Sequence, residues 1–255
     1  MSEGKIIVIE FPKMPVRRGI YLLPNLLTTV ALFAGFYSIV ATLKGMFDVA
    51  AMVIFIAMVA DSLDGRVARM TNTQTAFGAE YDSISDMVSF GIAPALLGYS
   101  WGLISLGKIG WVVAFIYVAA TALRLARFNT QVGMADKRYF QGIPCPAAAA
   151  IVAGFIWVIE DNHLVADHIL VILFALFMLA VSVLMVSRVR FHSFKDVHWQ
   201  GRVPFVSLLI LVLLFACVAF EPPEVLFTLA MIFGFSGPIL TLWNLRQRKL
   251  KRKHK

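Results

Sequence analysis

The chain has 255 residues, of which 60% are hydrophobic and only 15% are charged, and its mean hydropathy is +0.81. Soluble domains contain about 45–50% apolar and about 25% charged residues, so this composition excludes an ordinary soluble domain and indicates an integral membrane protein. The net charge of +8 does not indicate a nucleic-acid partner, because the basic residues lie between apolar segments, as in membrane proteins. The two cysteines, Cys145 and Cys217, are far apart and predict no disulfide framework.

Apolar stretches long enough to cross a bilayer, about 17–25 residues each, follow one another along the chain. They predict an all-α polytopic bundle of about eight transmembrane helices in a single membrane domain, residues 1–255. Residues 22–200 form the expected core, and residues 201–255 add two spans and a basic tail. Residues 5–20 precede the first span and lie either along the inner leaflet as an interfacial segment or in solvent. The predicted spans are Leu22–Leu43, Phe47–Asp64, Tyr81–Trp101, Ile109–Phe128, Pro144–Ile159, Ile169–Val186, Pro204–Phe220 and Val225–Trp243.

Lysine and arginine residues alternate between the two ends of these spans. One set of flanks is strongly basic, and the other carries few basic residues and several carboxylates. Because basic loops stay on the cytoplasmic side, both termini are expected in the cytoplasm, which requires an even number of spans. The basic set consists of Lys13, Arg17, Arg18, Arg66, Arg69, Arg124, Arg127, Lys137, Arg138, Arg188, Arg190, Lys195, Arg202 and the tail from Arg246 to Lys255.

Four aspartates lie in or beside the second and third predicted spans: Asp61, Asp64, Asp82 and Asp86. An ionised carboxylate at membrane depth is costly, so such residues usually face a polar cavity or mark a functional path. Asp61 and Asp64 are three residues apart and share a helix face, as do Asp82 and Asp86, four residues apart. Two adjacent antiparallel helices joined near residues 70–76 would therefore bring both pairs together.

Four carboxylates in a small volume repel one another unless cations neutralise them. Ligand sets made only of oxygen favour hard ions such as Mg²⁺, Mn²⁺ or Ca²⁺. The sequence therefore predicts that Asp61, Asp64, Asp82 and Asp86 bind a pair of divalent cations, which would balance the charge and hold a pyrophosphate.

Small residues accompany the aspartates. Gly78 lies one turn before Asp82, and Gly65 follows Asp64, so a ligand or a neighbouring backbone can approach closely at both places. Arg69 is placed to bind a phosphate through two hydrogen bonds, whereas we interpret Arg66 as a topology anchor.

These residues carry a resemblance to a known family. The pattern D-x-x-D-G-x-x-A-R-x₈-G-x-x-x-D-x-x-x-D, formed by Asp61, Asp64, Gly65, Ala68, Arg69, Gly78, Asp82 and Asp86, resembles the signature of the CDP-alcohol phosphatidyltransferases without departure. The resemblance implies a two-metal site with the first three aspartates as ligands, with Asp86 as both a ligand and the catalytic base. It also implies a homodimer, for which the residues themselves offer only Ala31-x-x-x-Gly35 as a small-residue helix contact.

Further stretches resemble the bacterial phosphatidylserine synthases of this family: residues 23–28, 32–39, 122–129, 140–146 and 185–196. The expected reaction is transfer of a phosphatidyl group from CDP-diacylglycerol to the hydroxyl of L-serine, giving phosphatidylserine and CMP in a bacterial-type cytoplasmic membrane. Asp86 would take the proton of that hydroxyl. The pattern H-x-K-x₄-D, which marks a phospholipase-D-like route to the same product through a covalent intermediate, does not occur in the sequence. Direct transfer through a ternary complex is therefore expected.

Three more residues are candidates for the acceptor pocket. Arg124, Arg127 and Asn129 lie at the cytoplasmic end of the fourth span, where an arginine fork suits a serine carboxylate, although such arginines also serve as topology anchors. Asn25 either contacts the CDP-lipid or caps the first span.

Other functions stay open on the residues alone. The same chemistry can use glycerol 3-phosphate or inositol phosphate as the acceptor. A carboxylate-lined cation transporter also places aspartates in a membrane, but it predicts carboxylates spread across the bilayer rather than gathered near one face.

Overall fold

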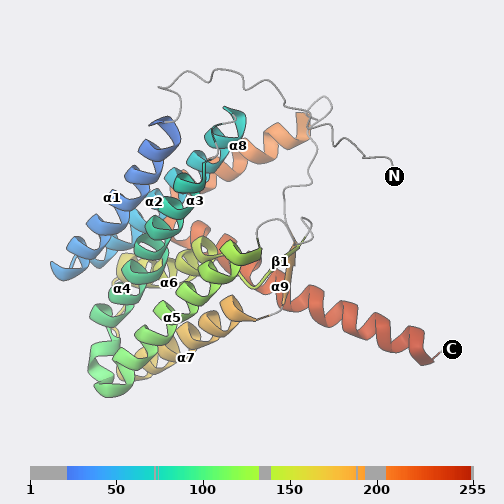
Figure 1. The fold of residues 1–255 in the computed structure, drawn as a ribbon. Coiled ribbons are helices and arrows are strands. Elements are labelled where there is room, and N and C mark those ends of the chain that lie inside the picture. The colour runs from blue at the N-terminus through green and yellow to red at the C-terminus, as the bar shows by residue number, and fades with distance from the viewer. Residues whose placement is uncertain are drawn as a thin grey trace, which may run out of the picture.

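The computed structural model describes residues 22–71, 73, 75–131, 139–187, 189–192 and 205–253, which are almost entirely helical (Figure 1). The predicted interfacial segment lies outside the described residues, as do Lys13, Arg17, Arg18, Lys137, Arg138, Arg188, Lys195 and Arg202. The helices are α1 (Leu22–Leu43), α2 (Phe47–Met70), α3 (Ala76–Asp86), the π-helix η1 (Met87–Ile92), α4 (Ala93–Trp101), the 3₁₀-helix η2 (Leu103–Leu106), α5 (Lys108–Gln131), α6 (Cys145–Asp161), α7 (His168–Val186), α8 (Phe205–Phe220) and α9 (Pro222–Lys253).

The helices follow the predicted apolar stretches closely, and α1 has the predicted bounds. Four segments in the described part are long and apolar enough to cross a membrane: Leu22–Leu43, Lys108–Thr130, His168–Val186 and Pro222–Thr241. By comparison, α6 and α8 have only 17 and 16 residues, and α2 carries Asp61, Asp64 and Arg66 in its second half. The chain is thus a multi-pass membrane protein with four candidate spans among its described residues.

The third predicted span is not one regular helix, because α3 passes through the π-helical turn η1 before α4 begins. Pro94 lies at the start of α4 and has no amide hydrogen to donate to the carbonyl of Phe90. The hydroxyl of Tyr117, on α5, donates to this carbonyl instead at 3.1 Å. This π-helical turn comes directly after Asp86. The carbonyl oxygen of Phe90, which lacks its α-helical donor, is hydrogen-bonded from the neighbouring helix α5.

The fold is all-α as predicted, apart from one small two-stranded antiparallel sheet. β1 (Tyr139–Gln141) pairs with β2 (Arg190–His192), and Phe140 lies opposite Phe191. The backbone continues this pairing, since the amide of Gly142 donates to the carbonyl of Val189 at 2.8 Å. The loops that precede α6 and follow α7 thereby satisfy each other's polar backbone groups.

The centre of the bundle is α6, which packs against α2, α4 and α9. Its small buried residues allow close helix contacts; they include Ala148, Ala149, Ala150 and Ala153. In contrast, α8 packs chiefly against α9, and most of its described side chains are exposed, as expected of a helix that faces lipid. α9 runs past the predicted end at Trp243 to Lys253 and projects from the bundle in red (Figure 1).

α1 is the helix that organises the functional end of the molecule. It packs extensively against α2 and also against α3, η1 and α4, whereas α2 and α3 make little direct contact with each other. The two aspartate-bearing helices are therefore placed by their common neighbour rather than by each other. The small residues Ala31 and Gly35, expected at a dimer contact, face η1 of the same chain, where the hydroxyl of Ser89 donates to the carbonyl of Ala31 at 3.0 Å.

Candidate metal centre

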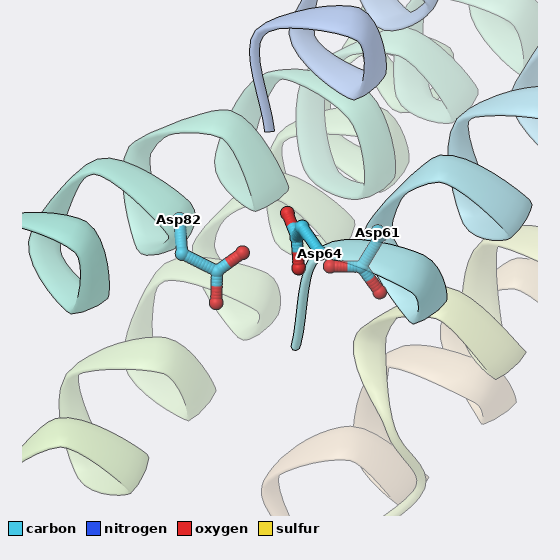
Figure 2. Close-up of side chains that lie close together, drawn as sticks. All are labelled: Asp61, Asp64 and Asp82. Carbon is cyan, nitrogen blue, oxygen red and sulfur yellow. The ribbon is translucent and has the colours of Figure 1, made fainter. Parts of the chain in front are cut away.

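Three of the four predicted aspartates converge. Asp61 and Asp64 lie one turn apart near the end of α2, and Asp82 approaches from α3 after the short connection at residues 71–75. One carboxylate oxygen from each lies within 4.8 Å of those of the other two. Figure 2 shows the three carboxylates turned toward a common space between the two helices. The predicted approach of the two helices is therefore present for Asp61, Asp64 and Asp82.

Asp86 lies one turn beyond Asp82, at the end of α3 and immediately before the π-helical turn. It is not one of the three residues in the closest group. Its carboxyl group nevertheless comes within hydrogen-bonding range of the carboxyl group of Asp61. The fourth aspartate thus adjoins the cluster from the end of α3.

The chemistry of this cluster fits a hard divalent cation. At 4.8 Å and an effective dielectric constant near 20, two ionised carboxylates repel each other by roughly 3–4 kcal/mol. The Oδ1 atom of Asp82 is buried and has no hydrogen-bond partner among the described residues, although buried polar atoms normally have one. A bound cation with oxygen ligands would relieve the repulsion and satisfy this atom, so Asp61, Asp64 and Asp82 could bind a metal ion.

Thr28, which no sequence motif singles out, supports the cluster. Thr28, on α1, donates its hydroxyl hydrogen to the Oδ2 atom of Asp64 at 2.7 Å. Its backbone carbonyl accepts a hydrogen bond from the hydroxyl of Ser85, on α3, at 3.2 Å. Thr28 belongs to the stretch of residues 23–28 already noted for its resemblance, but nothing in that pattern indicates which side chain the hydroxyl would meet.

Little crowds the backbone of α2 just after Asp64. A Cβ atom at Gly65 would meet nothing closer than the guanidinium of Arg69, at 3.7 Å. The exposed Arg69 side chain therefore folds back over the glycine on the aspartate side of α2. Ala68 is half-buried, and its carbonyl accepts the amide of Thr73 at 3.0 Å where the helix ends.

Gly78 and Asn25 lie side by side across the gap between α3 and α1. A Cβ atom at Gly78 would lie 3.4 Å from the Oδ1 atom of Asn25 and 3.1 Å from the hydroxyl oxygen of Thr75. That hydroxyl caps α3 by accepting the amide of Gly78 at 2.9 Å. Asn25 lies within α1 rather than before its first turn, so it does not cap the helix, and its Oδ1 atom lies on the side of α1 that faces Gly78.

The predicted acceptor residues lie near the site but do not form a single cluster of free donors. Arg124 donates to the carbonyl of Gln141 at 3.0 Å, and Arg127 donates to the carbonyl of Val186 at 3.1 Å. Arg124 also contacts the buried thiol of Cys145 and lies within electrostatic range of Asp86. Asn129 is hydrogen-bonded to Ser83, the neighbour of Asp82, at 3.1 Å.

Known proteins resemble this chain over much of its length. The family model for CDP-alcohol phosphatidyltransferases matches residues 21–179. A CDP-diacylglycerol–serine O-phosphatidyltransferase of Helicobacter pylori (strain ATCC 700392 / 26695) is 38% identical over 225 residues, which cover 87% of this chain and 92% of the relative.

Other relatives match shorter parts of the chain. An enzyme with the same name from Mycobacterium tuberculosis (strain ATCC 25618 / H37Rv) is 39% identical over 148 residues, which cover 55% of this chain and 51% of the relative. An archaetidylserine synthase of Methanothermobacter thermautotrophicus (strain Delta H) is 36% identical over 171 residues, covering 66% and 69%. The matched family region contains all four aspartates, and the chain belongs to the CDP-alcohol phosphatidyltransferase family.

Proposed function

We propose that this chain transfers the phosphatidyl group of CDP-diacylglycerol to the hydroxyl of L-serine, releasing CMP and phosphatidylserine. The observation that carries the proposal is the convergence of Asp61, Asp64 and Asp82 in a family whose substrates contain a pyrophosphate. Serine is favoured as the acceptor because the Helicobacter pylori relative, which is named for that reaction, matches 87% of the chain.

Asp61, Asp64 and Asp82, together with Asp86, would hold two divalent cations, Mg²⁺ or Mn²⁺, with Ca²⁺ as a further candidate. When bound, such ions supply positive charge that neutralises the pyrophosphate and the departing CMP. Family membership and the all-oxygen donor set both support metal dependence.

In the transfer itself, the serine hydroxyl oxygen forms a bond to the lipid-side phosphorus, and the bond from this phosphorus to the bridging oxygen breaks. CMP leaves with the electron pair, and Asp86 takes the hydroxyl proton. An aspartate is a weak base near neutral pH, so placement of the serine oxygen supplies much of the rate. The contact between Asp86 and Asp61 supports placing this base beside the reacting phosphate.

The remaining predicted residues divide between the two substrates. Asn25, Gly65, Ala68, Arg69 and Gly78 lie around the CDP-lipid: the glycines permit close approach, and Arg69 binds a phosphate oxygen. Arg124, Arg127 and Asn129 form the acceptor side. Each arginine uses one nitrogen on a backbone carbonyl, which leaves other guanidinium hydrogens for the serine carboxylate.

The protein works in a cytoplasmic membrane as one domain of eight spans, with both termini and the site on the cytoplasmic side. The helices at all eight predicted positions and the basic flanks at one end support this topology. Residues 22–200 form the catalytic core, and α8 and α9 are the additional spans. A homodimer is part of the proposal on family grounds alone.

The test is CMP release by the purified chain in detergent with CDP-diacylglycerol, Mn²⁺ or Mg²⁺, and each acceptor supplied separately. We expect serine-dependent release that is abolished by EDTA and lowered at least about 100-fold in Asp86→Asn, since general-base catalysis contributes typically 10²–10⁴-fold.

Each other outcome has a definite meaning. Release with glycerol 3-phosphate or inositol phosphate, but not with serine, contradicts the acceptor assignment. No release with any acceptor, from folded protein that still binds Mn²⁺, contradicts the transferase proposal and favours cation transport.

A further inference from the structure

Thr28 lies between the two helices that carry the aspartates. It is 4% exposed, and Asp64 beside it is 5% exposed. Its hydroxyl is 2.7 Å from the Oδ2 atom of Asp64 on α2, and its carbonyl oxygen accepts from Ser85 on α3. A single residue of α1 is therefore bonded to both sides of the cluster.

The direction of the hydroxyl bond is fixed by chemistry. An ionised carboxylate has no hydrogen to donate, so the hydrogen between Thr28 and Asp64 comes from the threonine. The same hydroxyl lies 3.1 Å from the carbonyl of Pro24, one turn earlier in α1, but the carboxylate contact is the shorter of the two. The bond uses one acceptor position of Oδ2, so it fixes how the carboxylate is turned and leaves its other acceptor positions for a cation.

The backbone bond positions the other helix. Ser85 is 2% exposed and directly precedes Asp86, so its bond to the Thr28 carbonyl fixes α3 where the fourth aspartate projects. Ser89 repeats this contact one turn later on the carbonyl of Ala31. Because α2 and α3 make little direct contact with each other, these bonds to α1 set the spacing between the two aspartate pairs.

We propose that Thr28 is a positioning residue of the metal centre, whose hydroxyl holds the Asp64 carboxylate in its ligating orientation. The inference rests on the proposed function in that the cluster is taken to bind divalent cations. Hydrogen-bond partners of metal ligands fix ligand orientation, and their loss typically weakens metal affinity or activity about 10- to 100-fold.

The ordinary role of a buried helical threonine is a bond to the carbonyl four residues earlier, and the chain offers a control for it. Thr121, on α5, is fully buried and donates to the carbonyl of Tyr117 at 3.0 Å. Its other hydrogen-bond contact is the sulfur of Met185 at 3.7 Å, and it is bonded to no aspartate among the described residues. Thr121→Val therefore removes the same hydroxyl and the same kind of backbone bond as Thr28→Val, but leaves the cluster untouched.

The test is a titration of Mn²⁺ alone into the purified full-length chain, without lipid or serine. Two readouts are recorded against Mn²⁺ concentration: the rise in melting temperature, and the amount of bound Mn²⁺ measured by electron paramagnetic resonance. We expect Thr28→Val to raise the midpoint of both titrations about 10- to 100-fold. Thr28→Ser, which restores the hydroxyl, should return the midpoint to within about threefold of the starting protein, and Thr121→Val should leave it unchanged.

An unchanged midpoint in folded Thr28→Val overturns the proposal, as does an equal shift in Thr121→Val. If Thr28→Val gives no cooperative melting transition, Thr28→Ala is measured against the same criterion, because it removes the hydroxyl without a second branched methyl. Serine-dependent CMP release is measured separately on the starting protein. If the midpoint shifts in Thr28→Val but the starting protein releases no CMP, the positioning role is supported and the serine reaction is contradicted. If the starting protein releases CMP but the midpoint in Thr28→Val does not shift, the serine reaction is supported and the positioning role is contradicted.

Discussion

Asp82 is the aspartate whose role as a metal ligand is most directly testable. Asp64 has Thr28 as a hydrogen-bond donor, but the Oδ1 atom of Asp82 is buried without any partner among the described residues. A carboxylate in this position adds repulsion to the cluster, and its Oδ1 atom gains no hydrogen bond from the described residues around it. Its presence is explained by a ligand that binds from outside the chain.

Asp82→Asn should abolish stabilisation by Mn²⁺ without making the metal-free protein less stable. The amide keeps the shape of the side chain and removes one charge from the repelling cluster. We expect the melting temperature in EDTA to be equal to or above that of the starting protein. CMP release should fall at least about 100-fold, because losing a ligand should exceed the typical effect of losing an outer-sphere partner.

The matched control for that measurement is Asp48→Asn, which neutralises an exposed aspartate in the first turn of the same helix, far from the cluster. It should leave both Mn²⁺ stabilisation and CMP release nearly unchanged. Mn²⁺ stabilisation of Asp82→Asn equal to that of the control would remove Asp82 from the ligand set.

Single residues also mark where prediction from sequence succeeds and where it stops. The grouping of the aspartates was predictable, because their spacing fixes helix faces and the membrane makes isolated charges costly. The role of Thr28 was not, because the partner of a buried hydroxyl depends on which helix packs against it. The arginines Arg124 and Arg127 were predicted near the site, but their bonds to strand and helix-end carbonyls depend on a sheet that no local pattern indicated.

At the level of elements, the contact of α1 with η1 places the second aspartate pair. A Cβ atom at Gly35 would lie 2.6 Å from the Cα atom of Ser89, so only glycine allows this approach. For a Cβ atom at Gly65, on α2, the nearest neighbour is a guanidinium nitrogen of Arg69 at 3.7 Å, which is an ordinary contact. The two helical glycines therefore serve different purposes, one for packing and one for access of a ligand.

Gly35→Ala and Gly65→Ala should separate these purposes. Gly35→Ala forces backbone apart and should lower the free energy of unfolding by about 1–3 kcal/mol, as overpacking does. Gly65→Ala should raise stability by up to about 1 kcal/mol, since alanine favours the helix, but lower CMP release about 10- to 100-fold by displacing the bound lipid phosphate. Melting temperature and turnover are measured on both variants.

Ser62→Ala is the control for helix propensity in this pair, because Ser62 is an exposed neighbour of Asp61 in α2 and alanine is the better helix former. It should keep full activity. Normal activity in Gly65→Ala would show that no ligand passes closely over this glycine, and normal stability in Gly35→Ala would contradict the α1–η1 contact.

The elements themselves were largely predictable, because every apolar stretch in the sequence corresponds to helical structure. The exception within the third stretch has a physical cause in Pro94, which cannot complete an α-helical bond to Phe90. That a π-helical turn would follow, and that Tyr117 would donate to the freed carbonyl, depends on α5 and was beyond a reading of local sequence. The β1–β2 pair also joins segments about 50 residues apart.

For the whole molecule, the charges separate between the two ends of the bundle. Asp161, Glu221 and Glu224 come together, and Asp161 ends α6, whose first residue, Cys145, contacts Arg124 beside the aspartate cluster. The acidic group therefore lies at the opposite end of α6 from the site. The basic flanks gather at the end of the bundle that carries the aspartate cluster, and basic residues are retained on the cytoplasmic side. The aspartate cluster should therefore face the cytoplasm.

This orientation predicts opposite accessibility for two exposed positions. Ala76 begins α3 at the aspartate end, and Val165 lies in the connection between α6 and α7. Three predicted spans separate them: the α3–η1–α4 segment, α5 and α6. In a Cys217→Ser background, which keeps the buried Cys145, Val165→Cys should react with a membrane-impermeant maleimide in intact bacterial spheroplasts, and Ala76→Cys only after permeabilisation. Each variant is first checked for CMP release. The reverse pattern would place the site on the outer face, where cytoplasmic CDP-lipid headgroups and serine do not reach it. Labelling of both positions from one side would mean that one of the three segments does not cross the membrane.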